Sequence, residues 1–416
     1  MGLAARCVPR YGCGDENKRP LSILRARRAP DTMSAGAVLV YRDRIVPRSE
    51  AQFLRRLYIG FEQLVPHWIG CRLDAGLADL GVEPSILGRS GILGAVDRAL
   101  FKQFGILPSR PDLRALEPRI IHAHFGRGGT LALPIARSLG IPLVVTFHGG
   151  DATKEKHYRR RLLPTIYQRR LEQLKREAAA IICVSDFIRD RLLARGFPAG
   201  KLEVIRYGVE PAPDEPGIPA APEPYALFVG RFVEKKGIVH LLDAIRLLRA
   251  RGQPLSLVLI GDGPLAETLK SAAADLADVR FIGWQSQEMV RGWMRHALAL
   301  CVPSVVAREG DAEGLPNVVL EAMATATPVI GSRNAGIGEA IADNVTGLLV
   351  PPGEPAALAA ALARLIDDPA ARAAMAVAAR RRAAEHFSAS TQSRLLEATL
   401  LAIVRERRRL PAACHA

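Results

Sequence analysis

Short apolar runs alternate with stretches of helical periodicity along most of this chain. Such alternation is typical of parallel α/β proteins, in which helices connect and cover buried strands. The apolar runs are residues 37–41, 68–71, 120–123, 142–146, 181–184, 202–205, 226–229, 255–260, 279–282, 298–302, 328–331 and 348–350. The helical stretches include residues 50–65, 91–104, 129–139, 157–179, 186–195, 355–366, 369–385 and 389–409. We therefore predict an α/β fold built from two doubly wound units.

A proline-rich segment separates the first six apolar runs from the last six. It holds six prolines within residues 209–224, which indicates an extended linker. Because 416 residues exceed what one hydrophobic core ordinarily serves, two domains are expected. The predicted organisation is an extension without periodicity at 1–35 (with Met33 a candidate initiator), a first domain at 36–208, the linker at 209–224, a second domain at 225–386 and a terminal helix at 387–416.

Composition narrows the class of protein and its partners. Apolar residues make up 49%, yet no apolar stretch approaches the roughly 20 residues of a membrane span. The basic N-terminus lacks the apolar core of a secretory signal, so we predict a cytoplasmic protein. The formal charge of +15 predicts anionic partners. Nucleic acid is not expected, because no binding motif accompanies the low aromatic content of 5%.

The six cysteines are dispersed and show no metal-ligand spacing. Three of them lie in apolar, strand-like runs, which predicts reduced core residues. These three are Cys71, Cys183 and Cys301.

Residues 313–321 place two carboxylates on either side of a predicted helix start. Pro316 suits a first turn, where its missing N–H has no intrahelical partner. The free N–H groups of such a helix can hold an anion, while Glu313 and Glu321 can accept hydrogen bonds from ligand hydroxyls. A phosphate and a polyol together indicate a nucleotide sugar. The alternative is an ordinary helix start with a surface glutamate.

Residues 226–237 form a second motif, an apolar strand followed by glycine and cations. Arg231 and Lys236 are placed to grip a diphosphate, although each alone fits a solvated surface cation equally well. Together with residues 313–321, about 80 positions later, this segment resembles the Gly-Arg-x4-Lys and Glu-x7-Glu elements of the retaining GT-B glycosyltransferases of family 4. The resemblance extends over about residues 36–390.

The resemblance implies a GT-B fold, in which two Rossmann-like domains face each other across a cleft, and it assigns roles to the matching residues. Arg231 and Lys236 neutralise the donor diphosphate, whose charge grows as the glycosidic bond breaks. Glu321 binds the nucleotide ribose, and Glu313 binds hydroxyls of the donor sugar. The implied donor-binding set is Arg231, Lys236, Gly261, Glu313, Gly314, Leu315 and Glu321, with residues 283–286 beside the base.

In the first domain, the run at 142–146 ends in a polar turn that holds His148 and Asp151. By the resemblance, His148 lies beside the donor sugar as a catalytic residue, and Asp151 orients it or binds the acceptor. Taken alone, this His-x2-Asp pattern fits a capped turn. His122 and His124 point the same way on a strand, so a metal pair is one interpretation. Without a third ligand we favour binding or structural histidines and expect no metal cofactor.

Two further segments look like the exopolysaccharide and colanic-acid-type branch of the family: residues 47–50, in which Ser49 is a predicted helix N-cap on the acceptor side, and residues 305–312. Gly338 stands where many relatives have proline, which predicts a looser donor-phosphate loop. Residues 154–176 are rich in Lys and Arg, with an apolar stripe of Leu162, Leu163, Ile166 and Tyr167. This pattern fits either a helix on anionic lipid or a solvated helix packed on the sheet.

We therefore predict a retaining glycosyltransferase that moves a sugar from a nucleotide-diphosphate sugar to a lipid-linked saccharide in exopolysaccharide or lipopolysaccharide synthesis. It would act on the inner face of the cell membrane. The alternatives are transfer to a soluble acceptor and a non-catalytic, nucleotide-sugar-binding subunit. Both a covalent route and a front-face displacement are compatible with retention, and we prefer the second.

Overall fold

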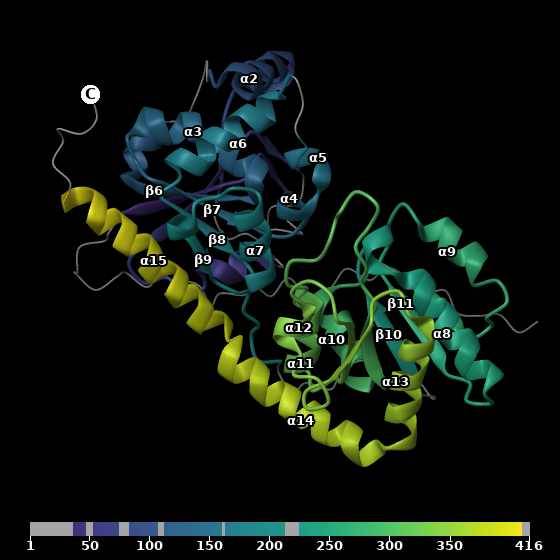
Figure 1. Ribbon diagram of the computed structural model, residues 1–416. Coiled ribbons are helices and arrows are strands. Elements are labelled where there is room, and N and C mark those ends of the chain that lie inside the picture. The colour runs from purple at the N-terminus through teal and green to yellow at the C-terminus, as the bar shows by residue number, and fades with distance from the viewer. Residues whose placement is uncertain are drawn as a thin grey trace, which may run out of the picture. The chain divides into compact units, whose positions relative to one another are not determined.

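A computed structural model describes residues 36–46, 53–74, 83–106, 112–159, 163–212 and 224–409. The chain forms two lobes, each built on one parallel sheet with helices on both faces (Figure 1). All twelve predicted apolar runs contain a strand. The sequence did not predict three two-residue strands: β2 (Arg44–Ile45), β4 (Arg72–Leu73) and β5 (Ser85–Ile86).

The sheet of the first lobe has seven strands in the order β5-β3-β1-β6-β7-β8-β9. Its longer strands are β1 (Ala37–Tyr41), β3 (Val65–Gly70), β6 (Pro118–His124), β7 (Leu143–Phe147), β8 (Ala180–Cys183) and β9 (Leu202–Val204). Every residue of β1, β7 and β8 is buried, as expected for parallel strands covered on both faces. The strand order reverses between β1 and β6, and ligands of doubly wound sheets bind at such reversals.

The sheet of the second lobe has six strands in the order β12-β11-β10-β13-β14-β15. They are β10 (Tyr225–Val229), β11 (Ser256–Ile260), β12 (Val279–Gly283), β13 (Ala299–Val302), β14 (Val329–Ser332) and β15 (Leu348–Val350). Here the reversal falls between β10 and β13. The carboxyl ends of these two strands therefore mark the second expected ligand position.

Helices of the first lobe are η2 (Arg55–Tyr58), α2 (Gly91–Phe104), η3 (Leu113–Leu116), α3 (Phe125–Leu139), α4 (Gly150–Thr153), α5 (Glu155–Tyr158), α6 (Ile166–Glu177), α7 (Asp186–Ala194) and η4 (Ala199–Lys201). Those after it are η5 (Glu234–Lys236), α8 (Ile238–Ala250), α9 (Ala266–Ala272), α10 (Gln287–His296), α11 (Asn317–Ala324), α12 (Ile337–Ala340), α13 (Pro355–Asp367), α14 (Pro369–His386) and α15 (Ala389–Arg409). The predicted helices at 91–104, 186–195, 355–366, 369–385 and 389–409 are confirmed within one or two residues. The stretch at 157–179 contains α6 and the end of α5.

The predicted helix at 50–65 is wrong over its described part. Two residues of π-helix at 53–54 and then η2 form there in place of an α-helix, and β3 already begins at Val65. The reason lies in α15, where the Glu397 carboxylate accepts the backbone N–H groups of Glu62, Gln63 and Leu64 at 2.7–3.0 Å. Those N–H groups would otherwise bond within a helix, so a tertiary acceptor has overridden the local pattern.

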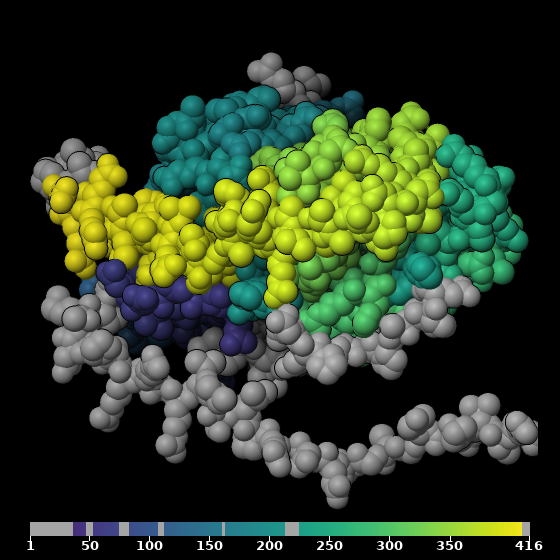
Figure 2. All heavy atoms as spheres, turned by 90° about the horizontal axis from the view of Figure 1, so that it is seen from below, coloured from purple at the N-terminus to yellow at the C-terminus, as the bar shows by residue number. Residues whose placement is uncertain are grey.

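The last helix thus packs on the first lobe although it follows the second in sequence. Ser393 of α15 donates to the carbonyl of Leu57 and accepts from the N–H of Gly60, both at 2.9 Å. Figure 2 shows the yellow C-terminal helices lying against the green second lobe and the purple start of the first. The predicted domain boundaries remain predictions, and most of the linker, 213–223, lies outside the described residues.

Cys71, Cys183 and Cys301 are buried free thiols, as predicted. Burial raises the pKa of each thiol, to about 11 for Cys71 and about 12 for the other two. Among the described helices, none has both the length and the apolar character that a membrane crossing requires.

Candidate active site

Lys236, the last residue of η5, and Glu313, which precedes α11, form a largely buried ion pair in the second lobe. The Lys236 Nζ lies 3.1 Å from Glu313 Oε1, and the two side chains are only 14% and 10% exposed. Gly237 follows with φ +62, and a Cβ there would stand 1.9 Å from the carbonyl oxygen of Pro303, so only glycine allows this tight turn. Among the described residues, Glu313 Oε1 makes this ion pair but meets no donor with hydrogen-bond geometry, so it can still accept a hydrogen bond from a ligand hydroxyl.

Three other predicted donor residues line one cavity of about 650 Å³ at the carboxyl ends of β10 and β11: Arg231, Gly261 and Glu321. Gly261 has φ +135, and a Cβ there would stand 2.0 Å from the carbonyl oxygen of Gly230. Only glycine therefore fits at this position in the cavity wall, where two backbone segments lie against each other. Trp284 and Gln285, within the segment predicted beside the base, also line it.

An arginine of the first lobe contacts the second acidic residue of the motif. Arg56 of η2 places its guanidinium 2.9 Å from Glu321 Oε1, and Gln287 lies 3.5 Å from the same oxygen. Sequence reasoning missed Arg56, because residues 265 positions apart carry no common spacing signal. The contact brings η2 to the rim of the cavity.

The two lobes are in close contact at Gly314. A Cβ on Gly314 would stand 2.0 Å from the carbonyl oxygen of His148, and one on Gly336 would stand 1.9 Å from the carbonyl oxygen of Gly314. The neighbouring Leu315 is buried. Gly338 lies within α12, where an added Cβ would have its nearest neighbour at 3.9 Å.

His148 is buried at the carboxyl end of β7 with both ring nitrogens bonded to protein. Its Nδ1 contacts the Tyr207 hydroxyl, and its Nε2 lies 3.1 Å from His124 Nδ1. Burial, with the positive charge of Arg42, holds the pKa of His148 well below its usual range. The ring is therefore neutral at physiological pH.

Asp151 serves the backbone around His148. Its carboxylate accepts the N–H groups of His148 at 3.0 Å, Gly149 at 2.8 Å and Gly126 at 3.0 Å. Burial raises the pKa of this carboxyl, and the three donors oppose that shift. Asp151 thus fixes the turn that carries His148, while Ser49 lies outside the described residues.

His122 and His124 do point the same way, toward one tyrosine. The Tyr58 hydroxyl lies 2.7 Å from His122 Nδ1 and 2.7 Å from His124 Nε2. Nowhere in the described ranges do three His, Cys, Asp or Glu side chains come together as a metal site would require.

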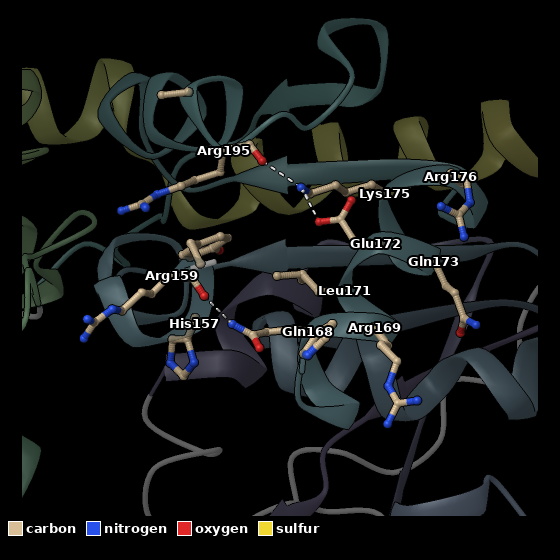
Figure 3. Close-up of a pocket in the computed structure, with 13 residues that line it drawn as sticks. His157, Arg159, Gln168, Arg169, Leu171, Glu172, Gln173, Lys175, Arg176 and Arg195 are labelled. Carbon is tan, nitrogen blue, oxygen red and sulfur yellow. Dashed lines mark hydrogen bonds and ion pairs between the residues drawn. The ribbon is translucent and has the colours of Figure 1, made fainter. Parts of the chain in front are cut away.

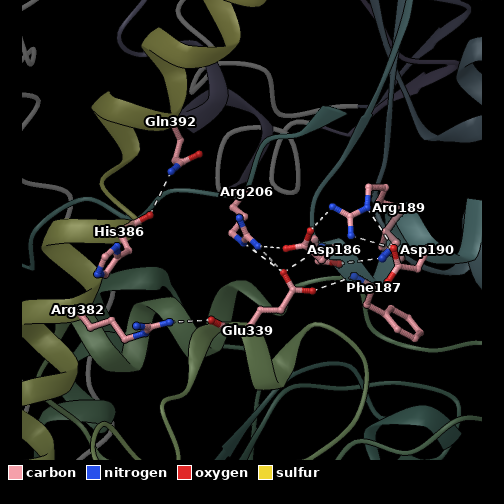
Figure 4. A network of polar contacts seen from close by, with 11 residues as sticks. Asp186, Phe187, Arg189, Asp190, Arg206, Glu339, Arg382, His386 and Gln392 are labelled. Carbon is pink, nitrogen blue, oxygen red and sulfur yellow. Dashed lines mark hydrogen bonds and ion pairs between the residues drawn. The ribbon is translucent and has the colours of Figure 1, made fainter. Parts of the chain in front are cut away.

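A carboxylate of the second lobe caps a helix of the first. Glu339 accepts the N–H groups of Asp186 and Phe187 at 3.0 and 2.9 Å, at the start of α7 (Figure 4). Arg206 pairs with both Glu339, at 2.8 Å, and Asp186. Negative charge at a helix N-terminus is stabilising, so this contact ties the lobes together. We did not predict this contact from the sequence, although Arg206, a charged residue shortly after β9, was a usable signal of a polar contact.

Both lobes match known families of sequence. Residues 76–212 match glycosyltransferase family 4, and residues 214–382 match glycosyl transferases group 1. A GDP-mannose-dependent alpha-(1-6)-phosphatidylinositol monomannoside mannosyltransferase of Mycolicibacterium smegmatis is 31% identical over 324 residues, covering 72% of this chain and 82% of the relative. The chain belongs to the group 1, family 4 glycosyltransferases. This membership confirms the predicted family.

Two further comparisons of this glycosyltransferase concern the branch of the family and the fold. The amylovoran biosynthesis glycosyltransferase AmsK of Erwinia amylovora is 34% identical over 276 residues, which are 65% of this chain and 66% of AmsK. The chain thus spans just under two thirds of that relative. The structure of Anabaena HepE in complex with UDP and glucose matches with a TM-score of 0.68 at 19% identity, over 88% of this chain and all of HepE. That likeness concerns the fold, and the predicted GT-B fold is confirmed.

Proposed function

We propose that this chain transfers a sugar from a nucleotide-diphosphate sugar to a saccharide acceptor. The observation that carries the proposal is the convergence of Lys236, Glu313, Arg231 and Glu321 at the ends of β10, β11 and β13. A cavity beside them has room for a nucleotide. HepE, a neighbour in fold, was solved with UDP and glucose, which supports this ligand class.

The charges suit the breaking of a bond to diphosphate. Arg231 and Lys236 would meet the negative charge that grows on the leaving phosphate, and such preorganised charge lowers the barrier by several kcal/mol. Glu313 would accept a hydroxyl of the donor sugar at Oε1, the oxygen that faces Lys236 Nζ. Glu321 would exchange Arg56 for the ribose hydroxyls.

We propose transfer with retention by front-face displacement. A covalent route needs a carboxylate below the anomeric carbon. The two candidates near His148 are otherwise engaged: Asp151 holds three backbone N–H groups, and Glu313 pairs with Lys236. In the proposed route the leaving phosphate itself takes the acceptor proton, and no metal is required.

We propose a lipid-linked acceptor in exopolysaccharide or lipopolysaccharide synthesis, at the cytoplasmic face of the membrane. The name of AmsK links that relative to amylovoran biosynthesis. The first lobe also carries an exposed apolar helix face, on α2. There Ile92 is 86% exposed, Val96 48% and Phe104 69%, which is unusual for side chains of this kind in a closed protein surface.

Cations lie beside that apolar face. Phe104 and Arg169 line one hollow of about 830 Å³ between α2, α3 and α6, and Arg170 ties α6 to α2 by donating to the carbonyl of Lys102 at 3.0 Å. A second hollow, of about 880 Å³, continues along α6 (Figure 3). Arg159, Arg169 and Arg176 lie along it and have no ion pair among the described residues. Each such cation contributes about 1 kcal/mol near an anionic lipid surface.

The predicted lipid-facing stripe lies differently. In α6 the apolar residues Leu171 and Leu174 are buried against the lobe, which fits the packed-helix alternative for that helix. Leu163 alone in the described part of the stripe is strongly exposed, at 87%. We therefore assign the apolar part of the proposed membrane contact to α2 and the charged part to α6.

Donor use is tested with a panel of nucleotide sugars by thermal shift, followed by transfer assays with the best ligand. Glu313→Gln should lower the transfer rate about 100-fold or more, because a hydroxyl contact at the reacting sugar is lost. The control is Glu309→Gln, at an exposed side chain four residues before Glu313. A chain that binds a donor but never turns it over would instead be the non-catalytic subunit. Proton NMR of the product reports retention.

Membrane contact is tested by sedimentation with vesicles of phosphatidylglycerol and phosphatidylcholine. The triple change Arg159→Glu, Arg169→Glu and Arg176→Glu should release the protein at low salt. The matched control is Arg251→Glu, Arg280→Glu and Arg381→Glu, at exposed arginines after the linker. Equal retention of both variants would contradict the membrane proposal and favour a soluble acceptor.

A further inference from the structure

Six buried side chains of the first lobe form one continuous chain of hydrogen bonds, in the order Thr146, His122, Tyr58, His124, His148 and Tyr207. The first three contacts are each 2.7 Å, and the fourth, between the two histidine rings, is 3.1 Å. The last joins His148 Nδ1 to the Tyr207 hydroxyl. No member is more than 8% exposed. A chain of this length in a dry interior rigidifies the groups it joins.

The histidines of the chain are uncharged. Burial lowers the pKa of His122 to about 3 and holds those of His124 and His148 well below their usual range. Three charged groups act on the end of the chain formed by His148 and Tyr207. Arg42 opposes protonation of the His148 ring, and Asp151 and Glu313 raise the pKa of Tyr207. A neutral imidazole has one N–H donor and one acceptor nitrogen.

The contact between His124 and His148 couples their tautomers. Two nitrogens 3.1 Å apart need one hydrogen between them, so either His124 Nδ1 or His148 Nε2 carries it. In the first case both rings hold their hydrogen on Nδ1, and His148 donates to the Tyr207 oxygen. In the second both hold it on Nε2, and Tyr207 donates to His148.

The end of this chain lies at the junction of the lobes. The backbone of His148 abuts Gly314, beside Glu313, and the Tyr207 ring stacks on His148 at an interplanar angle of 12°. Phe125, whose ring is 4.3 Å from that of His148, has φ +67. A non-glycine residue in this conformation stores strain, which is common where a site must be held rigid.

We propose that Tyr207 is the ligand-binding residue at this end of the site, and that Tyr58 and His124 are positioning residues that act through His148. Both nitrogens of His148 are engaged, whereas within the described ranges the Tyr207 hydroxyl has one protein partner, so it can bond a sugar hydroxyl as well. The tautomer of the coupled pair decides whether Tyr207 donates to the ligand or accepts from it. This inference rests on the proposed sugar transfer.

The first test needs no substrate. Nitrogen-15 NMR of labelled histidine side chains should show His124 and His148 in the same tautomer and neutral at pH 5.5. In Tyr58→Phe the packing of the ring is kept, but the His124 Nε2 signal should shift because its partner is gone. Different tautomers for the two rings, or titration near pH 6.5, would overturn the chain.

The second test is kinetic. Tyr207→Phe should raise KM for the sugar substrate about 10-fold, the usual worth of one neutral hydrogen bond, with a smaller change in kcat. Tyr225→Phe also removes a tyrosine hydroxyl, in this case one that donates to the backbone carbonyl of Trp293; it is the control and should keep the wild-type KM. An unchanged KM in Tyr207→Phe overturns the ligand-binding role. A protein that passes the NMR test yet transfers no sugar contradicts the proposed function and not the chain.

Discussion

The two halves of the candidate site solve different physical problems. On the second lobe the site residues are charged and form ion pairs: Lys236 with Glu313, and Glu321 with Arg56 of the first lobe. On the first lobe, neutral histidines and tyrosines are fully buried and joined end to end. Charge suits a phosphate-bearing ligand that arrives from water, whereas a buried neutral network fixes geometry without the cost of desolvating ions. The difference separates binding from positioning.

Forcing the halves apart should give the largest effect. In Gly314→Ala the new methyl group would overlap the His148 carbonyl oxygen, 2.0 Å away, and displace one half relative to the other. Misplacement by about 1 Å lowers rates about 100-fold, so we expect at least that loss in a transfer assay. Gly200→Ala is the control, because nothing lies within 4 Å of its added methyl. Full activity in Gly314→Ala would mean that the halves work independently.

Lowering the pH should destabilise the protein through the neutral, buried histidines of the first lobe. The folded pKa of His122, about 3, is far below the unfolded value of roughly 6.5, so only the unfolded chain takes up a proton between these values. Stability is therefore complete above pH 6.5 and falls below it, by about 1.4 kcal/mol per pH unit for each such histidine. Urea unfolding between pH 7 and 5.5, followed by tryptophan fluorescence, measures the slope.

Replacing one histidine sharpens that measurement. His122→Gln should reduce the slope by about one proton, whereas His386→Gln, at an exposed side chain, should leave it unchanged. Equal slopes in all three proteins would mean that the chain histidines are protonated in the folded state.

The smallest effect is expected at the contact that holds the halves together from outside the site. Glu339→Gln removes the ion pair with Arg206 and weakens the cap on α7, at a cost of about 1 kcal/mol. The melting temperature should fall by about 1 °C, as measured by calorimetry. Glu385→Gln, at an exposed side chain, should not change it. A large loss of donor affinity in Glu339→Gln would instead place this contact within the site.

The sequence predicted most of the fold and the charged half of the site, and it did so for the same reason. Buried parallel strands and the motifs at their ends are local patterns, so β10 could be found from its apolar run, and the pair Arg231 and Lys236 from its place after that run together with the family resemblance. Contacts between distant segments leave no such pattern. Arg56 reaches Glu321 across 265 positions, and Tyr207 reaches His148 from another strand end. The failed helix at 50–65 has the same cause, since its N–H groups are taken by Glu397.

That last contact has a consequence for how the chain matures. Glu397 is more than 330 positions after the three backbone groups it holds, so during synthesis the segment beside η2 has no such acceptor until nearly the whole polypeptide has left the ribosome. Arg56 lies shortly before this segment, in η2. The first-lobe side of the proposed donor cavity is therefore completed only when translation is almost finished.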